Sequence, residues 1–198
     1  MLNRRVMTFT IISTVIFFGL YYAIAPQYLP EKNASINATI FKPNKPLADF
    51  HLKDTNNKSF TKQSLRGHWV LMLFGYMHCP EVCPKNLGVL AKTWEIFAHK
   101  NYYPVNFIFA SIDPQIPATK DLHDYLFNYN SKFVGIFGPV DRMNELTTQL
   151  GIYAKREGKV IDHSTSLILI DPQGRLKAII TPPFEPEALA YDLEVLTK

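Results

Sequence analysis

The chain has 198 residues, of which 47% are hydrophobic, so it can form one ordinary domain with a proper core and additional segments. Its formal net charge is +4, from 21 Lys and Arg residues against 17 Asp and Glu residues. Two of the positive charges, Arg4 and Arg5, precede an apolar segment, and the others are too few and too evenly spread for a nucleic-acid-binding surface. We therefore expect no nucleic acid among the partners of this protein.

The apolar segment near the N-terminus, residues 6–25, contains no charged residue. As a helix it would span about 30 Å, which is the thickness of the hydrocarbon core of a bilayer. The apolar stretch of a signal peptide is normally shorter, and Pro26 directly after Ala25 disfavours cleavage at that point. We therefore predict one N-terminal transmembrane helix over 6–25, preceded by a short cytoplasmic N-terminus, 1–5.

The orientation of this anchor follows from its basic flank. Arg4 and Arg5 predict that the N-terminus stays in the cytoplasm and that the rest of the chain lies outside. The segment 1–5 is too short for a mitochondrial transit peptide. We therefore expect a single-pass protein of the bacterial inner membrane, with its C-terminal domain in the periplasm. Because the periplasm is oxidising, thiols exposed there need a purpose or a reducing partner.

Residues 26–46 are rich in proline, asparagine and lysine and show no hydrophobic periodicity, so they are interpreted as a tether. The folded domain is expected to cover 47–198. It opens with two short apolar stretches around the polar turn 54–58, which predict a hairpin. The continuous apolar run 69–74 does not alternate, and this predicts a central strand that is covered on both faces.

The remaining pattern alternates between helix and strand periodicity. It predicts strands over 105–112, 133–137, 165–170 and 175–180, and helices over 84–99, 118–129, 140–150 and from Pro186 onward. This order is typical of an α/β fold with one mixed central sheet flanked by helices.

The only two cysteines, Cys79 and Cys83, lie between the apolar strand and the following helix. A buried strand that leads into two thiols at the start of a helix is the arrangement of a thioredoxin-like active site. A disulfide closing so short a loop would constrain little unfolded-chain entropy, so the pair is interpreted as functional. Because a helix N-terminus favours anions, we expect both thiols to ionise more readily than free cysteine.

Three interpretations of the thiol pair remain open at this point. The pair could chelate a soft metal, since two thiolates suit Cu(I) and, together with an imidazole, also Cu(II). It could instead cycle between dithiol and disulfide, or form a stable structural disulfide. Zinc would need a fourth ligand, and the sequence offers no obvious one.

A third ligand would favour the metal, and His163 is the best candidate among the six histidines. It directly precedes the strand predicted over 165–170. In a thioredoxin-like sheet, the loop entering that strand faces the cysteine loop. His78 is a weaker candidate because adjacent residues on a loop seldom point the same way. The other histidines are expected at the surface: His51, His68, His99 and His123.

Four segments of the chain resemble the Sco/SenC copper chaperones: Gly75-Tyr76-Met77-His78-Cys79-Pro80-Glu81-Val82-Cys83-Pro84, Ser111-Ile112-Asp113-Pro114, Val160-Ile161-Asp162-His163-Ser164 and Asp171-Pro172-Gln173-Gly174. The resemblance covers about 47–198 and extends to the anchor arrangement. It implies a membrane-anchored, thioredoxin-like protein that helps assemble the dinuclear copper centre of cytochrome c oxidase subunit II.

The resemblance also implies roles for individual residues. Cys79 and Cys83 match the copper thiolates of the family, and His163 matches its third ligand. Asp113 matches a residue near the metal that would support the site or take part in partner docking. Glu81 stands where the family usually has aspartate, and it is expected near the metal or the partner.

The function that these residues imply is copper binding and transfer rather than turnover of a substrate. The expected partners are cytochrome c oxidase subunit II and an upstream copper donor or thiol reductant. The alternative is a thiol-disulfide reductase that keeps the copper-site cysteines of the oxidase reduced, which needs both cysteines but no histidine. A peroxide-reducing thiol enzyme on a related fold is a third hypothesis.

Overall fold

The computed structural model describes residues 37–100, 105–113, 118–157 and 160–198, all of which belong to the unit Ile36–Lys198. No helix within these described residues is long and apolar enough to cross a membrane. The predicted anchor, 6–25, and the short N-terminus, 1–5, lie outside them.

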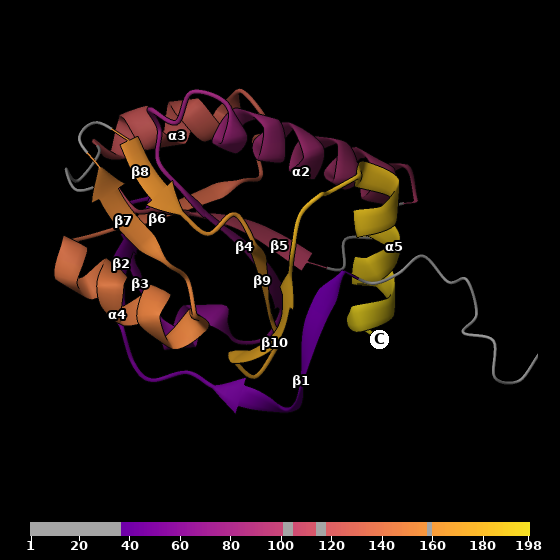
Figure 1. Cartoon of the computed structure of the whole chain (residues 1–198). Helices are drawn as coiled ribbons and strands as arrows, with labels where there is room; N and C mark the ends of the chain where they lie inside the picture. Colours follow the sequence, from indigo (N-terminus) through magenta and orange to yellow (C-terminus); the bar gives the residue numbers. More distant parts are fainter. Residues whose placement is uncertain (1–36, 101–104, 114–117, 158–159) are drawn as a thin grey trace, which may run out of the picture. The chain divides into compact units, whose positions relative to one another are not determined.

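An eight-stranded mixed sheet forms the centre of the domain, in the order β1-β10-β9-β4-β5-β6-β2-β3 (Figure 1). Strands β4, β5 and β6 are parallel to one another, and the other pairings are antiparallel. The predicted mixed sheet is therefore confirmed. The strands are β1 (Ala38–Pro46), β2 (His51–Asp54), β3 (Ser59–Thr61), β4 (Trp69–Gly75), β5 (Val105–Ser111), β6 (Val134–Phe137), β9 (Leu167–Ile170) and β10 (Arg175–Ile180).

The position of β4 at the centre of the sheet explains its unbroken apolar sequence. All its residues after Trp69 are buried, and alternate side chains enter the cores on opposite faces of the sheet. β4 and β5 are in register along their whole length, from Trp69 opposite Val105 to Gly75 opposite Ser111. The carboxyl ends of both strands therefore meet at one edge, and the cysteine loop follows directly from it.

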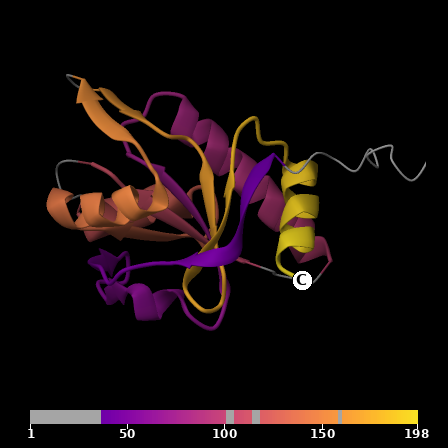
Figure 2. The same ribbon diagram turned by 60° about the horizontal axis from the view of Figure 1, so that its bottom comes forward.

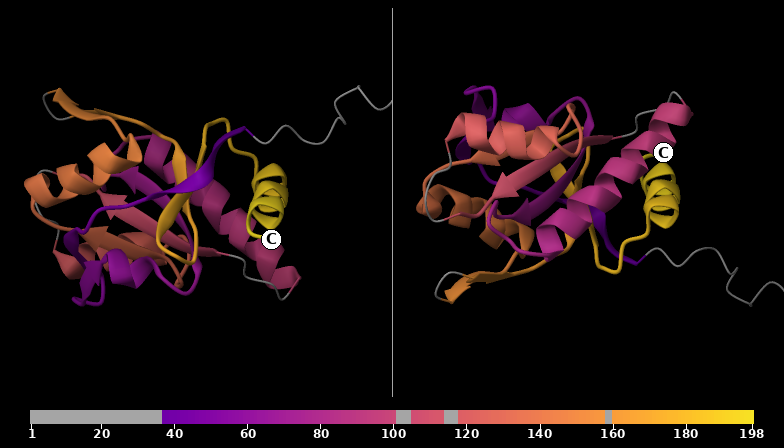
Figure 3. Two further views of the ribbon diagram at one scale, coloured as in Figure 1. Left: turned by 90° about the horizontal axis from the view of Figure 1, so that it is seen from below. Right: turned by 90° about the horizontal axis from the view of Figure 1, so that it is seen from above.

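Helices cover both faces of the sheet (Figure 1; Figure 3, right). α2 (Val82–His99), α3 (Thr119–Phe127) and α5 (Pro186–Leu196) share one core with the residues of β4 that point to that side. α4 (Val140–Leu150) and the 3₁₀ helix η1 (Lys62–Leu65) contribute to the core on the opposite side. α4 ends at Gly151, which adopts φ +70° as a left-handed C-terminal cap. The predicted helices are thus confirmed, with boundary shifts of a few residues.

Strand β1 corrects the tether predicted over 26–46. Its residues Ala38–Pro46 pair antiparallel with β10 at the edge of the sheet, with an irregularity in register between Ile40 and Lys45. Proline and lysine in this segment suggested a tether, yet both are compatible with an edge strand, where one row of N–H groups has no partner strand. The folded domain therefore begins before residue 47.

A two-stranded hairpin, β7 (Ala154–Glu157) and β8 (Val160–His163), was not predicted from the sequence. It projects beyond the end of the central sheet (Figure 2). Ala154 lies opposite His163 in its register. The hairpin therefore places the candidate histidine at the end of β8, although His163 lies 80 residues after Cys83 in the sequence.

The turn between β9 and β10 is built around the buried carboxylate of Asp171. This carboxylate accepts hydrogen bonds from the side chain of Asn44 (2.6 Å), the N–H groups of Gln173 and Arg175 (both 2.9 Å) and the guanidinium group of Arg175 (2.8 Å). Burial acts to raise the pKa of Asp171, but these hydrogen bonds together lower it. Asp171 thus fastens β1 to the β9–β10 turn as an anion.

We expect Asp171→Ala to lower the free energy of unfolding by about 2–4 kcal/mol, because four part-buried donor groups lose their charged, buried acceptor. Since the folded-state pKa lies below the unfolded value of about 4, this stabilisation is present above that value and is lost as the pH falls through the folded pKa. Urea denaturation at neutral pH checks the loss. Asp141→Ala, at an exposed carboxylate on α4, is the matched control, and equal losses in the two variants would contradict the assignment.

Candidate metal centre

The cysteine loop connects the end of β4 to the first turn of α2. The N–H of Cys79 donates to the carbonyl oxygen of Tyr76 (3.2 Å), which folds the loop back on itself. The N–H of Cys83 donates to the sulfur of Cys79 (3.3 Å). Glu81, at the N-cap of α2, makes no side-chain capping hydrogen bond. The Cys79 sulfur therefore takes over part of the capping at this helix terminus.

Both thiols are buried, with 7% of Cys79 and 1% of Cys83 exposed, and neither is in a disulfide. Burial raises the pKa of Cys83 to about 12, against the lowering effect of a hydrogen bond from the Tyr76 backbone. That value already includes smaller raising effects of the neighbouring Cys79 and of the charge of Asp113. The expectation that both thiols ionise readily is therefore wrong for Cys83, because the loss of hydration outweighs the helix N-terminus.

His163 faces the thiols from the end of β8. Its Nδ1 lies 2.9 Å from the carbonyl oxygen of Ser164, which can only accept, so Nδ1 carries the proton in the neutral ring. The lone pair is then on Nε2, 3.9 Å from the sulfur of Cys83. The N–H of Ser164 donates to the carbonyl of Tyr153 (2.9 Å), and the Ser164 hydroxyl accepts from the Tyr153 N–H (3.0 Å). These bonds fix the orientation of the imidazole before any metal arrives.

Among the described residues, Cys79, Cys83 and His163 form a cluster whose three ligand atoms lie within 4.8 Å of one another. Thiolate and imidazole ligands at about 2.3 and 2.0 Å from a metal, about 120° apart, would be about 3.7 Å from each other. The separation of 3.9 Å between Cys83 and His163 is close to this value. Two soft sulfurs and one imidazole nitrogen fit copper, so the donor set and the spacing both suit this metal.

Asp113 follows the carboxyl end of β5 and is hydrogen-bonded to the cysteine loop. Its carboxylate accepts hydrogen bonds from the N–H of Met77 and the hydroxyl of Ser111, both at 3.1 Å. Glu81 and His78 are exposed, and neither belongs to the three-ligand cluster. Partner docking by Asp113 or Glu81 stays a prediction.

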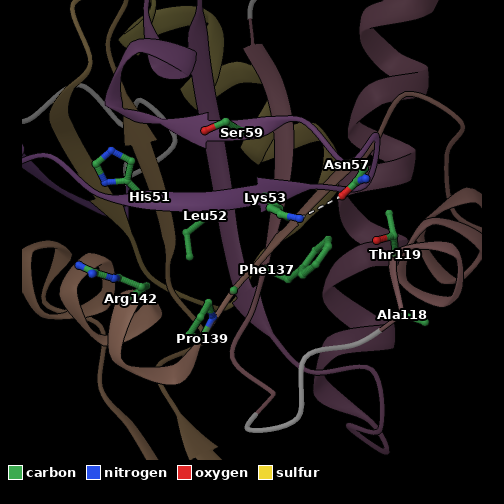
Figure 4. Close-up of a pocket in the computed structure, with 11 residues that line it drawn as sticks. His51, Leu52, Lys53, Asn57, Ser59, Ala118, Thr119, Phe137, Pro139 and Arg142 are labelled. Carbon is green, nitrogen blue, oxygen red and sulfur yellow. Dashed lines mark hydrogen bonds between the residues drawn. The ribbon is translucent and has the colours of Figure 1, made fainter.

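A second hollow, of about 630 Å³, lies between β2, the end of β6 and the first turns of α3 and α4 (Figure 4). His51, Lys53 and Arg142 stand around it, with Leu52 and Phe137 among its apolar residues. The charge of Arg142 is offset by Glu145 at 3.0 Å. None of the residues that line this hollow belongs to the cluster of Cys79, Cys83 and His163.

Gly75 is a residue of the site to which the sequence pattern assigns no role. A Cβ atom at this position would lie 2.6 Å from the sulfur of Cys83 and 2.9 Å from a ring carbon of Phe109. The first turn of α2 therefore reaches the end of β4 only because residue 75 has no side chain. The available signal was a glycine that ends the apolar strand immediately before the thiols.

We expect Gly75→Ala to weaken Cu(I) binding by at least about tenfold, because the added methyl group must displace the Cys83 sulfur from its position. Competition titration of the reduced protein measures this. Gly88→Ala is the matched control: a Cβ there meets nothing within 4 Å, and alanine in a helix interior stabilises by about 1 kcal/mol. An unchanged affinity in Gly75→Ala would show that the close approach is not needed.

Known proteins are similar to this chain in both sequence and fold. The family model described as SCO1/SenC matches residues 41–198. A SCO2-like protein of Rickettsia typhi is 32% identical over 173 residues, which cover 83% of this chain and 85% of that protein. The structure of Bradyrhizobium japonicum ScoI with copper bound is 31% identical and has a TM-score of 0.67, covering 76% of this chain and 99% of that one.

A more distant structure, BsSco, is described as a member of the Sco family of cytochrome c oxidase assembly proteins with a disulfide switch. It is 22% identical, with a TM-score of 0.64 over 78% of this chain and 94% of its own, and this likeness supports the fold. The thioredoxin-like α/β domain, its Cys-Cys-His cluster and the match over residues 41–198 lead to one conclusion: this chain belongs to the SCO1/SenC family.

Proposed function

We propose that this protein binds copper through Cys79, Cys83 and His163 and delivers it during assembly of cytochrome c oxidase. The observation that carries the proposal is the cluster of three ligand atoms within 4.8 Å, with the lone pair of His163 on the side of the thiols. The copper-bound state of Bradyrhizobium japonicum ScoI supports the choice of metal.

The residues of the site suggest how copper would be taken up and released. Ligation of Cys83 requires the loss of its proton, since the thiolate is the metal ligand. Three protein ligands leave one side of the metal open, and a thiolate or imidazole of the acceptor could enter there. Stepwise exchange of ligands would then pass copper to the partner without releasing it to water. The proposed acceptor is the dinuclear copper centre of oxidase subunit II, and the source is an upstream copper donor.

The proposed location follows from the segment before the described residues. The predicted anchor over 6–25 would hold the protein in the bacterial inner membrane with this domain in the periplasm. Because β1 begins at Ala38, the connection from the anchor to the sheet would be shorter than the predicted tether. Such tethering would keep the copper site close to a membrane-bound oxidase.

Thiol-disulfide exchange is the second candidate function. It is favoured by two free cysteines that lie close together, since the Cys83 N–H donates a hydrogen bond to the Cys79 sulfur. In this reaction the two thiols would become a disulfide, while a disulfide at the copper site of the oxidase would be reduced to two thiols. Two electrons and two protons would pass to the partner, and a thiol reductant would have to restore the pair.

Competitive Cu(I) titration of the reduced domain should show tight one-to-one binding. We expect His163→Ala and Cys83→Ala each to weaken it by more than about 100-fold, because even the loss of an outer partner of a metal ligand typically costs about 10- to 100-fold. His123→Ala, an exposed histidine on α3, should bind as the wild type does. Unchanged copper affinity in His163→Ala would remove this residue from the ligand set.

Oxidase assembly in cells separates the two candidate functions. Copper delivery predicts that strains carrying Cys79→Ala or His163→Ala both lose oxidase activity. Normal assembly with His163→Ala, together with failure of Cys79→Ala, would favour the reductase, which needs no imidazole.

Copper binding should also depend on pH with a definite sign. Because the pKa of Cys83 is raised to about 12, this thiol is protonated throughout pH 6–8 and must release its proton on ligation. The apparent Cu(I) affinity should therefore rise by about tenfold per pH unit for this proton alone. Titrations at pH 6, 7 and 8 measure the slope of the logarithm of the Cu(I) affinity against pH. This slope should be smaller by about one in Cys83→Ala, which lacks the proton that Cys83 releases. An affinity independent of pH would contradict the protonated state.

A further inference from the structure

The hollow of about 630 Å³ at the carboxyl end of β6 has no role in the copper ligation proposed above (Figure 4). Residues of β2, of β3 with the turn before it, and of the starts of α3 and α4 line it. Its volume falls within the range of roughly 300–1,000 Å³ that is typical of small-molecule sites. It also lies at the edge of the sheet where the parallel strands end, and α/β sheets commonly bind their ligands at this edge.

The floor of the hollow is apolar and close-packed. Leu52 and Phe137 are 4% and 5% exposed, and they belong to the cores on opposite faces of the sheet. A Cβ atom at Gly138, directly after β6, would lie 2.6 Å from Cδ2 of Leu52, so β2 and the end of β6 meet without space for another side chain. The floor is therefore in place before a ligand arrives, and it offers an apolar surface to a short hydrocarbon chain.

The charge around the hollow is positive. None of the described residues that line it is acidic, whereas Lys53, Arg142 and His51 do line it. The charge of Arg142 is offset by Glu145 at 3.0 Å. Lys53 forms no ion pair with any described residue, and its ammonium donates to the neutral amide oxygen of Asn57 at 3.4 Å. Lys53 therefore contributes one positive charge that no side chain in the described part of the chain neutralises.

Lys53 stands beside the apolar floor. It lies directly opposite Phe137 in the antiparallel register of β2 and β6, and residues in such a pair project to the same side of the sheet. Figure 4 shows Lys53, Asn57 and Thr119 on one side of the hollow together with Phe137, and Arg142 on the other side. The hydroxyl of Thr119 makes no hydrogen bond within the described residues. A charged donor and a hydroxyl donor thus accompany the apolar surface on the same side.

We propose that this hollow binds a small amphipathic carboxylate. Its carboxylate group accepts hydrogen bonds from the Lys53 ammonium and the Thr119 hydroxyl, and its apolar chain lies against Phe137 and Leu52. The single uncompensated charge of Lys53 matches a singly charged carboxylate, whereas a dianionic phosphate would keep one charge unpaired. The charge-assisted hydrogen bond provides the preference for an anion, and burial of the chain provides the other part of the affinity.

Binding of hexanoate to the full chain tests this proposal. The reduced, metal-free protein is placed in phosphatidylcholine nanodiscs at about 0.15 M salt, where charges more than about 8 Å apart are largely screened. Methyl NMR follows Leu52 and Thr119 at the hollow, and Leu193, buried in α5, as the internal reference. We expect saturable shifts at Leu52 and Thr119 and none at Leu193. Hexanamide, which has the same shape without the charge, should bind about three- to fivefold more weakly.

Lys53→Gln isolates the contribution of the charge, because it removes the ammonium and keeps most of the stem. We expect hexanoate to bind about three- to fivefold more weakly to this variant, while the affinity for hexanamide stays unchanged. Lys58→Gln is the matched control, since Lys58 is an exposed lysine of the same β2–β3 turn that does not line the hollow. This control should bind hexanoate as the wild type does.

Each other result overturns the proposal. The absence of saturable shifts with hexanoate does so, as does equal affinity for hexanamide, since neither fits a site that recognises a carboxylate. Equal losses in Lys53→Gln and Lys58→Gln would remove the assigned role of Lys53. Tighter binding of a capped peptide with one aspartate next to a leucine would identify a protein partner as the occupant. Copper is absent from these experiments, so their outcome is independent of whether the protein delivers copper.

Discussion

The site depends on the close approach of the first turn of α2 to the carboxyl end of β4. The sulfur of Cys83 occupies the space that a side chain at residue 75 would fill, with Phe109 closing the other side. This contact buries the thiol beneath the loop and brings it within 3.9 Å of His163. A rigid core on both faces of β4 keeps the strand end in place, so the position of the sulfur is set by close-packed elements and not by the loop alone.

Burial has a chemical consequence for the same atom. A thiol removed from water resists ionisation, and at Cys83 this effect exceeds the attraction of the helix N-terminus for an anion. The metal-free site is therefore stable as a neutral thiol, and metal binding is linked to proton release. The linkage suits a transfer protein, because the same proton can return when copper leaves. The uncharged state of Cys83 in the metal-free protein thus follows from its burial.

The two halves of the metal centre have different structural origins. The cysteines lie at the junction of β4 and α2, where both are buried. His163 comes from the β7–β8 hairpin, which projects beyond the sheet (Figure 2). Hydrogen bonds between Ser164 and Tyr153 orient the hairpin base, and Asp113 holds the loop at Met77. Tyr76 lies where these two halves meet.

Much of this could be predicted from local sequence. The apolar run before Cys79, the helical spacing after Cys83 and the alternation of helices and strands determined the fold class, since each follows from local periodicity. His163 was found through the expected placement of its loop. Tertiary structure alone decided the rest. Edge strand β1 is stabilised by its pairing with β10 and not by its own propensity. Burial raises the pKa of Cys83 and outweighs the helix N-terminus, which by itself would favour the thiolate. The role of Gly75 depends on Phe109, a residue from the neighbouring strand, and no local pattern encodes a contact of that kind.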